Sequence, residues 1–310
     1  TALGRFKHEN AELVISKDGK IVVYMGDDER GEYLYKYVSN ESINEVKDKS
    51  TLLSNGNLYV AKFNDNFTGE WLLLDTQTTG LSSKAEVCIF TRLAASKVGA
   101  TTMDRPEWIA SNPKKNEVCC CLTNNKNRGI KTNKGGDKVD VDKVNPRKNN
   151  KYGQIVRWKP RDNNHSSVYF EWDLFVVAGN PNVHDDNNRG SKNIDKENIF
   201  NSPDGLKFDK YGRLWIQTDG NYSNSGDFKG MGNNQMLIAD TNTGKIKRFM
   251  VGPKECEVTG LTFAPDYKTV FVGIQHPGER LGSNFPDNGN NKPRSCIIAI
   301  QKKDGSEILT

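Results

Sequence analysis

The sequence predicts an all-β protein and, within that class, a β-propeller. One hairpin pattern recurs along the chain, in residues 8–28, 105–125, 201–220 and 257–279. Further β-rich runs bring the expected total to roughly sixteen strands, or about four blades of four strands. Short β-units that repeat along a chain are typical of a propeller, although these repeats are unevenly spaced. A convincing helical pattern occurs only within residues 79–104.

The hairpin at residues 201–220 is the clearest of the four. Leu206 and Phe208 alternate with polar residues, a turn follows at residues 210–212, and a β-rich run resumes at residue 213. A hairpin brings its two ends to one edge of the sheet, so we expect Asp204 and Asp219 to lie at the same edge. Two carboxylates there form a possible metal or substrate site. The alternative is that Asp-Gly pairs are ordinary turn residues.

The other repeats align with this hairpin. When Gly260 is set on Gly205, Phe263 falls on Phe208. In this register three residues occupy the same place, namely Glu107, Asp204 and Thr259. Two others, Glu9 and Glu257, share a place two residues earlier. The inner strands of the blades are therefore predicted at about residues 11–16, 107–112, 204–209 and 259–264.

We expect one propeller domain over residues 1–310, truncated at the N-terminus, with three inserted segments. The first, residues 79–104, is a helix whose single apolar face comprises Val87, Phe90, Leu93 and Ala94. The second, residues 124–152, has few apolar anchors and is predicted to be a long mobile loop. The third, residues 180–197, is a polar insertion.

Composition excludes several classes of function. The chain has 310 residues, 35% of them hydrophobic, a mean hydropathy of −0.72 and a formal net charge of +5. The sequence lacks an apolar run long enough to cross a membrane. The Lys residues are scattered through loops without interleaved aromatic residues, which argues against nucleic acid and allows mild attraction of anionic substrates. The six cysteines lack metal-ligand spacing, and Cys119–Cys121 are interpreted as small core residues.

Acidic residues at the ends of inner strands point to metal binding. In a propeller these ends converge on a central channel, and converging carboxylates repel one another unless cations lie between them. Oxygen ligands favour calcium, and a softer ligand beside them admits iron or zinc. Arg105, two residues before Glu107, offers a planar donor fork that matches a phosphate. The alternative is a salt bridge between Arg105 and Glu107.

Two histidines lie next to these ends, His8 and His276. A histidine before proline, as at His276, is more often a hydrogen-bonding turn residue than a ligand. The sequence lacks a Gly-x-Ser-x-Gly nucleophile motif and any spacing that suggests a Cys–His pair, so catalysis by a covalent triad is unsupported.

At these residues the chain resembles the PhoX-type alkaline phosphatases, over nearly its whole length and in order. The motifs that carry the resemblance are Gly4-Arg-Phe-Lys-His-Glu, Tyr24-Met-Gly-Asp-Asp-Glu-Arg, Met103-Asp-Arg-Pro-Glu, Pro203-Asp-Gly-Leu with Gly212-Arg-Leu-Trp-Ile-Gln-Thr-Asp-Gly, Glu257-Val-Thr-Gly and Ile274-Gln-His-Pro-Gly-Glu.

The resemblance implies a six-bladed propeller that is exported to the periplasm or secreted and hydrolyses small phosphate monoesters as a monomer. It implies Ca²⁺ and Fe³⁺ as cofactors. By resemblance the metal ligands are Glu9, Glu107, Asp204 and Glu257, the catalytic and phosphate-binding residue is Arg105, and a further substrate-binding residue is His276. Secondary candidates are Asp27, Asp28, Asp219 and His8.

The resemblance also implies that this chain is a C-terminal fragment. The family's N-terminal part supplies iron ligands from a Cys beside paired Glu residues, and the iron role is not transferred to Cys256. The isolated chain is therefore expected to lack part of the metal site and to be inactive. Two alternatives remain, a calcium-dependent lactonase-like propeller and a non-catalytic propeller that binds a partner.

Overall fold

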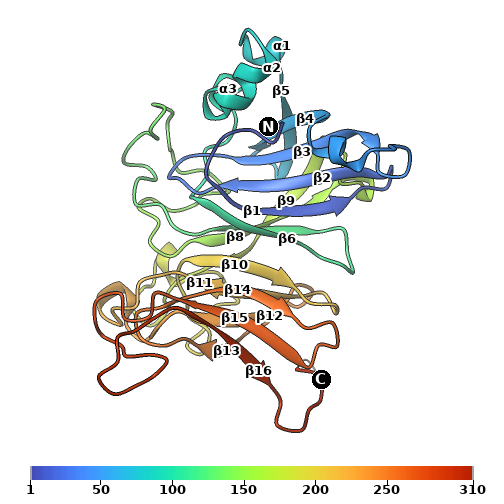
Figure 1. Ribbon diagram of the computed structural model, residues 1–310. Coiled ribbons are helices and arrows are strands. Elements are labelled where there is room, and N and C mark those ends of the chain that lie inside the picture. The colour runs from blue at the N-terminus through green and yellow to red at the C-terminus, as the bar shows by residue number, and fades with distance from the viewer. Residues whose placement is uncertain (1, 309–310) are drawn as a thin grey trace. The chain divides into compact units, whose positions relative to one another are not determined.

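The computed structural model describes residues 2–308, and its regular secondary structure consists mostly of antiparallel strands joined by long loops (Figure 1). The chain divides into two compact units, which are described separately. Unit 1 comprises Thr1–Lys151 and Ile155–Phe175, and unit 2 comprises Tyr152–Gln154 and Val176–Thr310. Sixteen strands lie in the described part of the chain, which confirms the all-β prediction. The single domain over residues 1–310 stays a prediction.

Unit 1 contains a nine-stranded sheet in the order β1-β2-β3-β4-β5-β9-β8-β7-β6. Its strands are β1 (His8–Ile15), β2 (Lys20–Asp27), β3 (Leu34–Ser42), β4 (Gly56–Phe63), β5 (Thr68–Leu74), β6 (Pro106–Ser111), β7 (Val118–Leu122), β8 (Gln154–Pro160) and β9 (Tyr169–Val177). The sheet consists of two meanders, β1–β5 and β6–β9, which are joined where β5 pairs with β9. Two predicted blades are thus joined into one sheet.

The first and last strands of this sheet lie side by side. The side chain of Asn10 on β1 both donates to and accepts from the backbone of Ile109 on β6, at 3.0 and 2.9 Å. Glu12 accepts a hydrogen bond from the backbone N–H of Ser111 at 2.9 Å. Side chains therefore replace a backbone ladder between the two strands, and both strands can present their N-terminal ends together.

Unit 2 contains two smaller antiparallel sheets. One is β10-β11-β12-β13, with β10 (Pro203–Phe208), β11 (Arg213–Thr218), β12 (Gln235–Asp240) and β13 (Ile246–Val251). The other is β14-β15-β16, with β14 (Glu257–Phe263), β15 (Thr269–Gln275) and β16 (Cys296–Gln301). Trp215, Met236, Val258 and Val272 lie in one buried cluster that these two sheets share. Apolar burial of about 25 cal/mol per Å² stabilises such sheet packing.

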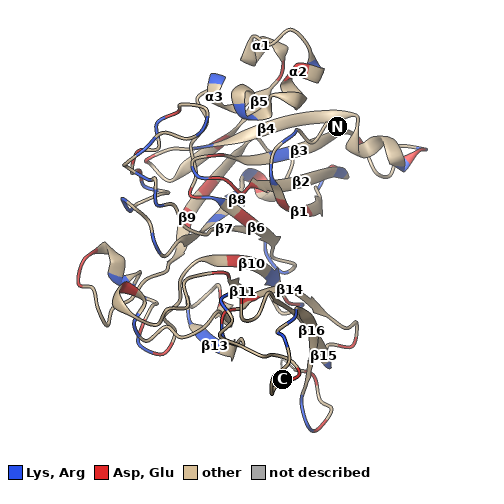
Figure 2. Cartoon of the chain, turned by 60° about the vertical axis from the view of Figure 1, so that its left-hand side comes forward, with Lys and Arg blue, Asp and Glu red and all other residues tan. Residues whose placement is uncertain are grey.

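The predicted inner strands are confirmed as β1, β6, β10 and β14, each the first strand of a hairpin. The core role of Cys119–Cys121 is also confirmed, since all three are fully buried. No helix among the described residues is long and apolar enough to cross a membrane. Lys and Arg residues are distributed over many loops, as the charge pattern predicts (Figure 2).

The helical insertion differs from the prediction. It contains α1 (Thr76–Thr79), α2 (Lys84–Ile89) and α3 (Thr91–Lys97), with a break at Phe90, whose φ and ψ are −103° and 44°. Val87 and Ala94 are buried, but Phe90 and Leu93 are 50% and 48% exposed. The single apolar face is therefore wrong, because the break turns α3 away from the helical register of α2.

The segment 124–152 is anchored by buried polar groups, which a low apolar content does not reveal. Arg128 is fully buried and its Nε donates to Asp104 at 2.7 Å, while Nη2 donates to the carbonyl of Thr102 at 2.8 Å. Asn125 and Asn150 form an isolated β-bridge. The segment is irregular, as predicted, but it packs on unit 1 through hydrogen bonds. Short 3-10 helices complete the described structure, at Lys49–Leu53, Arg161–Asn163, Asn187–Arg189 and Gly226–Phe228.

Candidate metal and phosphate site

A β-bulge interrupts the first strand of three hairpins at the same place. In β1 the pairing passes from His8↔Asp27 to Ala11↔Met25, so two residues of β1 oppose one residue of β2. The same step occurs in β6 and in β10. The first bulge residues are Glu9, Glu107 and Asp204. A bulge re-aims a side chain out of the strand's alternation, and it does so here for a carboxylate each time.

The fourth hairpin corrects the register that the sequence predicts. In β14 the bulge follows Thr259, which pairs with Gly273, so its first residue is Gly260. Gly260 has φ +64°, a conformation that glycine adopts without strain. Glu9 and Glu107 are both the first residue of a bulge, so they hold the same position in their hairpins. Glu257 instead pairs with Gln275, which is the first pair of its hairpin and precedes the bulge. The shared place proposed for Glu9 and Glu257 is therefore wrong, because a bulge shifts the ladder without changing the hydrophobic pattern.

Arg105 lies immediately before β6 and forms a two-point ion pair with Asp28. Its Nε donates to Asp28 Oδ1 at 2.7 Å and its Nη2 to Oδ2 at 2.9 Å. Nη2 also lies 3.3 Å from Oε1 of Glu107, so the alternative salt bridge of Arg105 with Glu107 is present as the longer contact. Arg105 has φ +57°, a backbone conformation that costs a non-glycine residue energy and that surrounding contacts must hold.

Glu9 and Glu107 belong to the same unit as Arg105. They offer carboxylate oxygens within 4.8 Å of each other. Glu107 is buried and Glu9 is exposed. Two carboxylates at this separation, with one of them also beside Arg105, are a set of hard oxygen donors that suits calcium.

A second group of possible ligands lies within unit 2, where three strand ends meet. Asp219 directly follows β11, Glu257 begins β14 and His276 directly follows β15. These side chains offer ligand atoms that all lie within 4.8 Å of one another. Two oxygens and an imidazole nitrogen form a donor set that admits iron or zinc as well as harder ions.

The geometry of His276 supports this interpretation. Its Nε2 lies 3.6 Å from Oε2 of Glu257, and Gln275 Nε2 donates to that same oxygen at 2.7 Å. The backbone N–H of His276 donates to Ser295 Oγ at 2.9 Å, and φ is +37°. Nδ1 is buried without a hydrogen-bond partner among the described residues. The residue is thus held in an unusual conformation beside two carboxylates.

The remaining candidates have other contacts. Asp27 is fully buried and binds Arg92 at two points, 2.7 and 2.6 Å, and burial raises its pKa. His8 stacks on Phe6 at 3.7 Å, and its Nε2 lies 3.0 Å from the carbonyl of Gly4. These contacts favour structural roles for Asp27 and His8.

Asp204 and Asp219 lie at one end of the same hairpin, as predicted. Pro203 pairs with Thr218, and the N–H of Asp219 donates to the carbonyl of Ser202 at 3.1 Å. The convergence of Glu9, Glu107, Asp204 and Glu257 on one centre stays a prediction, since these residues belong to different units. Cys256 is buried, and burial raises the pKa of its thiol to about 12, so a thiolate ligand is disfavoured there.

Two features of this region are not evident from the sequence. Asp28 was a secondary candidate, yet it is the main partner of Arg105, and only the pairing of strands distant in sequence reveals this. The grouping of Asp219 with Glu257 and His276 was also missed. The sequence offers one indication of this grouping, which is that all three residues lie at strand ends of the repeated hairpins.

Comparisons with known proteins place the chain among characterised families. Pseudomonas fluorescens PhoX, solved in complex with vanadate, a transition state analogue, is 55% identical, with a TM-score of 0.92 over 99% of this chain. This chain spans only 55% of that protein. A luciferin-regenerating enzyme matches over 92% of this chain at 10% identity, and this chain covers 74% of that protein. TolB from Acinetobacter baumannii matches over 96% of this chain at 12% identity, and this chain covers 55% of that protein. Their TM-scores are 0.37 and 0.32.

No curated protein matches the sequence. The likeness to the Pseudomonas protein confirms the propeller class, since the hairpins and sheets superpose over nearly the whole chain. A model of the family described as alkaline phosphatase PhoX matches residues 1–278. The chain belongs to the PhoX alkaline phosphatase family.

Proposed function

We propose that the protein is a metal-dependent phosphomonoesterase of the PhoX type. The observation that carries this proposal is the 55% identity, over 99% of this chain, to a PhoX solved with a transition state analogue of phosphoryl transfer. The grouped carboxylates and Arg105 support it. The substrates are small phosphate monoesters, the protein acts as a monomer, and it functions in the periplasm or outside the cell.

The cofactors proposed are Ca²⁺ and Fe³⁺. The oxygen donors Glu9 and Glu107 of unit 1 fit calcium, and Asp204 of unit 2 is a further carboxylate that we expect to serve as a ligand. The mixed group of Asp219, Glu257 and His276 fits iron. The buried Nδ1 of His276, which has no hydrogen-bond partner among the described residues, supports the fit of the second group. When bound, these ions supply positive charge that offsets the carboxylates and polarises a phosphoryl oxygen.

Arg105 binds and orients the phosphoryl group. Its Nε and Nη2 donate to Asp28, and its Nη1 lies 3.4 Å from Asn124 Oδ1; we assign the guanidinium group to a phosphoryl oxygen because its planar donor fork matches phosphate. Asp28 fixes the plane of the guanidinium group and thereby the direction of its donors. A donor that is already oriented costs no reorganisation when charge develops on the phosphoryl oxygens.

The test combines metal analysis with enzyme kinetics on the full-length protein. Calcium together with iron, and turnover of a phosphate monoester, are the expected results. Calcium alone with lactone hydrolysis would identify a lactonase-like enzyme, and absence of bound metal with no turnover would identify a non-catalytic propeller. Each of these last two results would overturn the proposal.

A further inference from the structure

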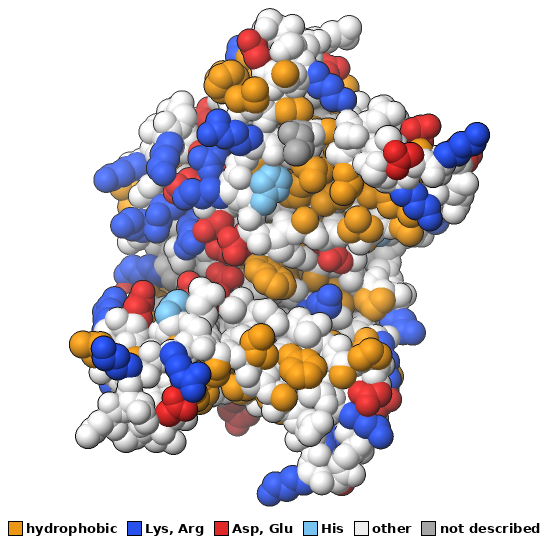
Figure 3. All heavy atoms as spheres, in the orientation of Figure 1, with side chains coloured by type: hydrophobic (Ala, Val, Ile, Leu, Met, Phe, Trp, Pro, Cys, Tyr) orange, Lys and Arg blue, Asp and Glu red, His pale blue; other side chains and the backbone are white. Residues whose placement is uncertain are grey.

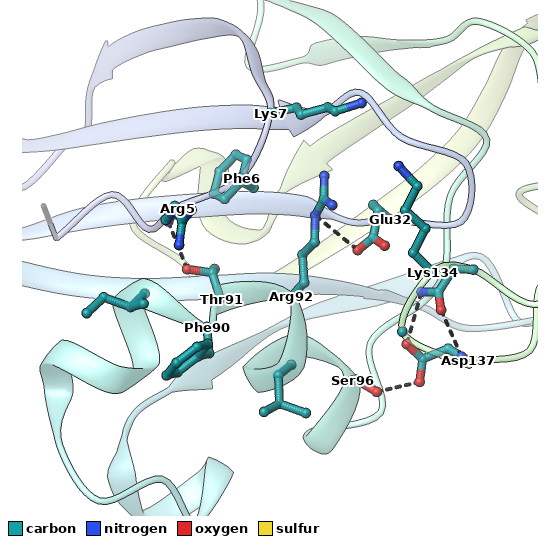
Figure 4. Close-up of a pocket in the computed structure, with 14 residues that line it drawn as sticks. Arg5, Phe6, Lys7, Glu32, Phe90, Thr91, Arg92, Ser96, Lys134 and Asp137 are labelled. Carbon is teal, nitrogen blue, oxygen red and sulfur yellow. Dashed lines mark hydrogen bonds and ion pairs between the residues drawn. The ribbon is translucent and has the colours of Figure 1, made fainter.

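A cavity of about 570 Å³ lies in unit 1, between the helical insertion and the segments that flank β1 and β3 (Figure 4). Its size falls in the range of small-molecule sites, roughly 300–1,000 Å³. Its lining combines aromatic and aliphatic groups with four cationic side chains, those of Arg5, Lys7, Arg92 and Lys134. None of its lining residues is among those assigned above to metal or phosphate.

One wall of the cavity is apolar. Ile89, Phe90 and Leu93 line it and are 47%, 50% and 48% exposed. The break between α2 and α3 at Phe90 directs these side chains outward. Three large apolar side chains thus line the same cavity within five residues, and they offer an apolar surface to a ligand that enters it.

The opposite rim is cationic where it meets solvent. Lys7 and Lys134 both pair with Glu29, their ammonium groups lying 3.0 and 2.6 Å from its Oε2. The two lysine side chains are 59% and 70% exposed, whereas the Glu29 side chain is 10% exposed. Arg5 is exposed at the same cavity. Two ammonium groups thus share one carboxylate, which leaves net positive charge at the entrance.

The other acidic groups lie beneath this rim. Asp27 and Glu32 have side chains that are 0% and 2% exposed, and both pair with Arg92. Asp137 is held by Tyr33 and Ser96. Asp137 is partly exposed, but the four cationic side chains of the lining outnumber its two acidic residues, Glu32 and Asp137, and the local field favours anions. Figure 3 shows Lys and Arg side chains gathered on this face of the chain.

We propose that this cavity binds an organic anion with an aromatic or apolar body. The acid group lies against Lys7 and Lys134, and the body rests on Phe90 and Leu93, on the side of the cavity where Arg5 lies (Figure 4). Arg105 and the candidate metal ligands do not line this cavity, so binding of the anion by itself can be measured apart from the phosphatase activity. The anion is either a separate ligand or the leaving part of an ester whose phosphoryl group lies at Arg105.

The probe is naphthalene-1-sulfonate, titrated into the full-length protein by calorimetry at low salt. Saturable binding at one site is expected. Phe90→Ala should weaken binding roughly tenfold, from the loss of about 1.5 kcal/mol of apolar contact. Lys134→Ala should weaken it several-fold at low salt and less at high salt, because exposed charges are screened. Neutral naphthalene-1-methanol should bind more weakly than the sulfonate.

Matched controls keep the test independent of folding. Phe271→Ala and Lys292→Ala remove an exposed aromatic and an exposed lysine from unit 2 and should leave the affinity unchanged. Leu93→Ala provides a second variant of the apolar wall. Binding that is absent, or that is equal in Phe90→Ala, Leu93→Ala and the controls, would overturn the proposal.

A competition experiment distinguishes the two sources of the anion. Inorganic phosphate that displaces the sulfonate, together with a lower kcat/KM of Phe90→Ala for naphthyl phosphate but not for glycerol phosphate, identifies the leaving group. Sulfonate binding that persists at saturating phosphate identifies a separate ligand. Loss of all phosphatase activity with sulfonate binding retained would contradict the proposed function and leave this cavity site standing.

Discussion

The two groups of candidate site residues differ in how their negative charge is balanced. In unit 1, Asp28 and Glu107 lie on either side of Arg105, at 2.7 and 3.3 Å. In unit 2, Asp219 and Glu257 lie beside an imidazole, with His276 Nε2 3.6 Å from Glu257. A guanidinium group carries its charge at every accessible pH, whereas an imidazole is a neutral metal ligand above its pKa.

This difference separates two tasks. In the Arg105 group the protein chain itself supplies one positive charge beside Asp28 and Glu107, so part of the negative charge is offset before any ion binds. The Asp219, Glu257 and His276 group brings carboxylates together beside a ligand nitrogen, and an added cation would stabilise that arrangement. Removal of metal should therefore loosen the second group more than the first.

The largest effect is expected from Glu257→Gln. The amide removes the negative charge that would hold the cation, so iron content should fall and kcat should drop by roughly 10³-fold, in line with loss of a metal-stabilised transition state. Metal analysis and phosphomonoester kinetics on the purified variant measure both. Glu197→Gln, an exposed position in the same unit, is the control. Full iron content in Glu257→Gln would contradict the assignment of the cation to the group of Asp219, Glu257 and His276.

Arg105→Ala should reduce kcat/KM by roughly 10²-fold or more, which corresponds to about 3 kcal/mol of transition-state stabilisation. Metal content should remain unchanged, because the arginine acts on phosphate. Arg105→Lys should recover little, since an ammonium group cannot bind Asp28 at two points and donate to phosphate as well. Loss of metal with normal turnover per loaded site would instead make Arg105 a structural partner of Glu107.

Glu32→Gln tests how much the buried carboxyl of Glu32, which pairs with Arg92, lowers the free energy of unfolding. Burial is the main cause that raises the pKa of Glu32 to about 7 from 4.5. The folded state then binds more protons than the unfolded state between pH 4.5 and 7, so the carboxyl's contribution to stability falls as the pH rises through this window. The isosteric Gln variant should be more stable than the wild type by about 1–3 kcal/mol at pH 8 and equal near pH 4. Equal urea midpoints at pH 8 would contradict the raised pKa.

The smallest effect is expected from Cys256→Ala. Its thiol is buried and its raised pKa disfavours a thiolate, so the variant should keep its iron and its turnover. Only packing is lost, at about 1 kcal/mol in the free energy of unfolding. Thiol labelling of the native wild type at pH 8 should leave Cys256 unmodified. A fall in iron content would add a thiolate to the unit 2 group and remove the contrast drawn above.

Alternating apolar residues and turn residues predicted the hairpins well, because both signals are local in sequence. The same signals could not place the bulge in β14, since an extra residue shifts the ladder at Gly260 while the apolar pattern continues. They could not show that Phe90 breaks a helix either, because Val87, Leu93 and Ala94 still follow a helical period.

The candidate site was predicted in part for the same reason. Individual acids at strand ends were recognisable, including Glu107 and Asp204, but their partners come from distant segments. Asp28 joins Arg105 across 77 positions of sequence. Likewise the buried contact of Arg128 with Asp104 fixes a segment whose composition suggested mobility. Polar pairs in a low-dielectric interior depend on geometry that composition does not encode.

The repeated bulge has a consequence for how this chain tolerates change. Each donor carboxylate is fixed by the ladder pairs on either side of it, as Glu107 is by Pro106↔Leu122 and Ile109↔Cys120. Segments inserted between hairpins can therefore lengthen, shorten or be exchanged without moving the donor. Deleting one bulge residue is a different kind of change, since it restores strict alternation and turns the carboxylate to the other face of its sheet. The position of each donor carboxylate thus depends on a few backbone pairs of its own hairpin.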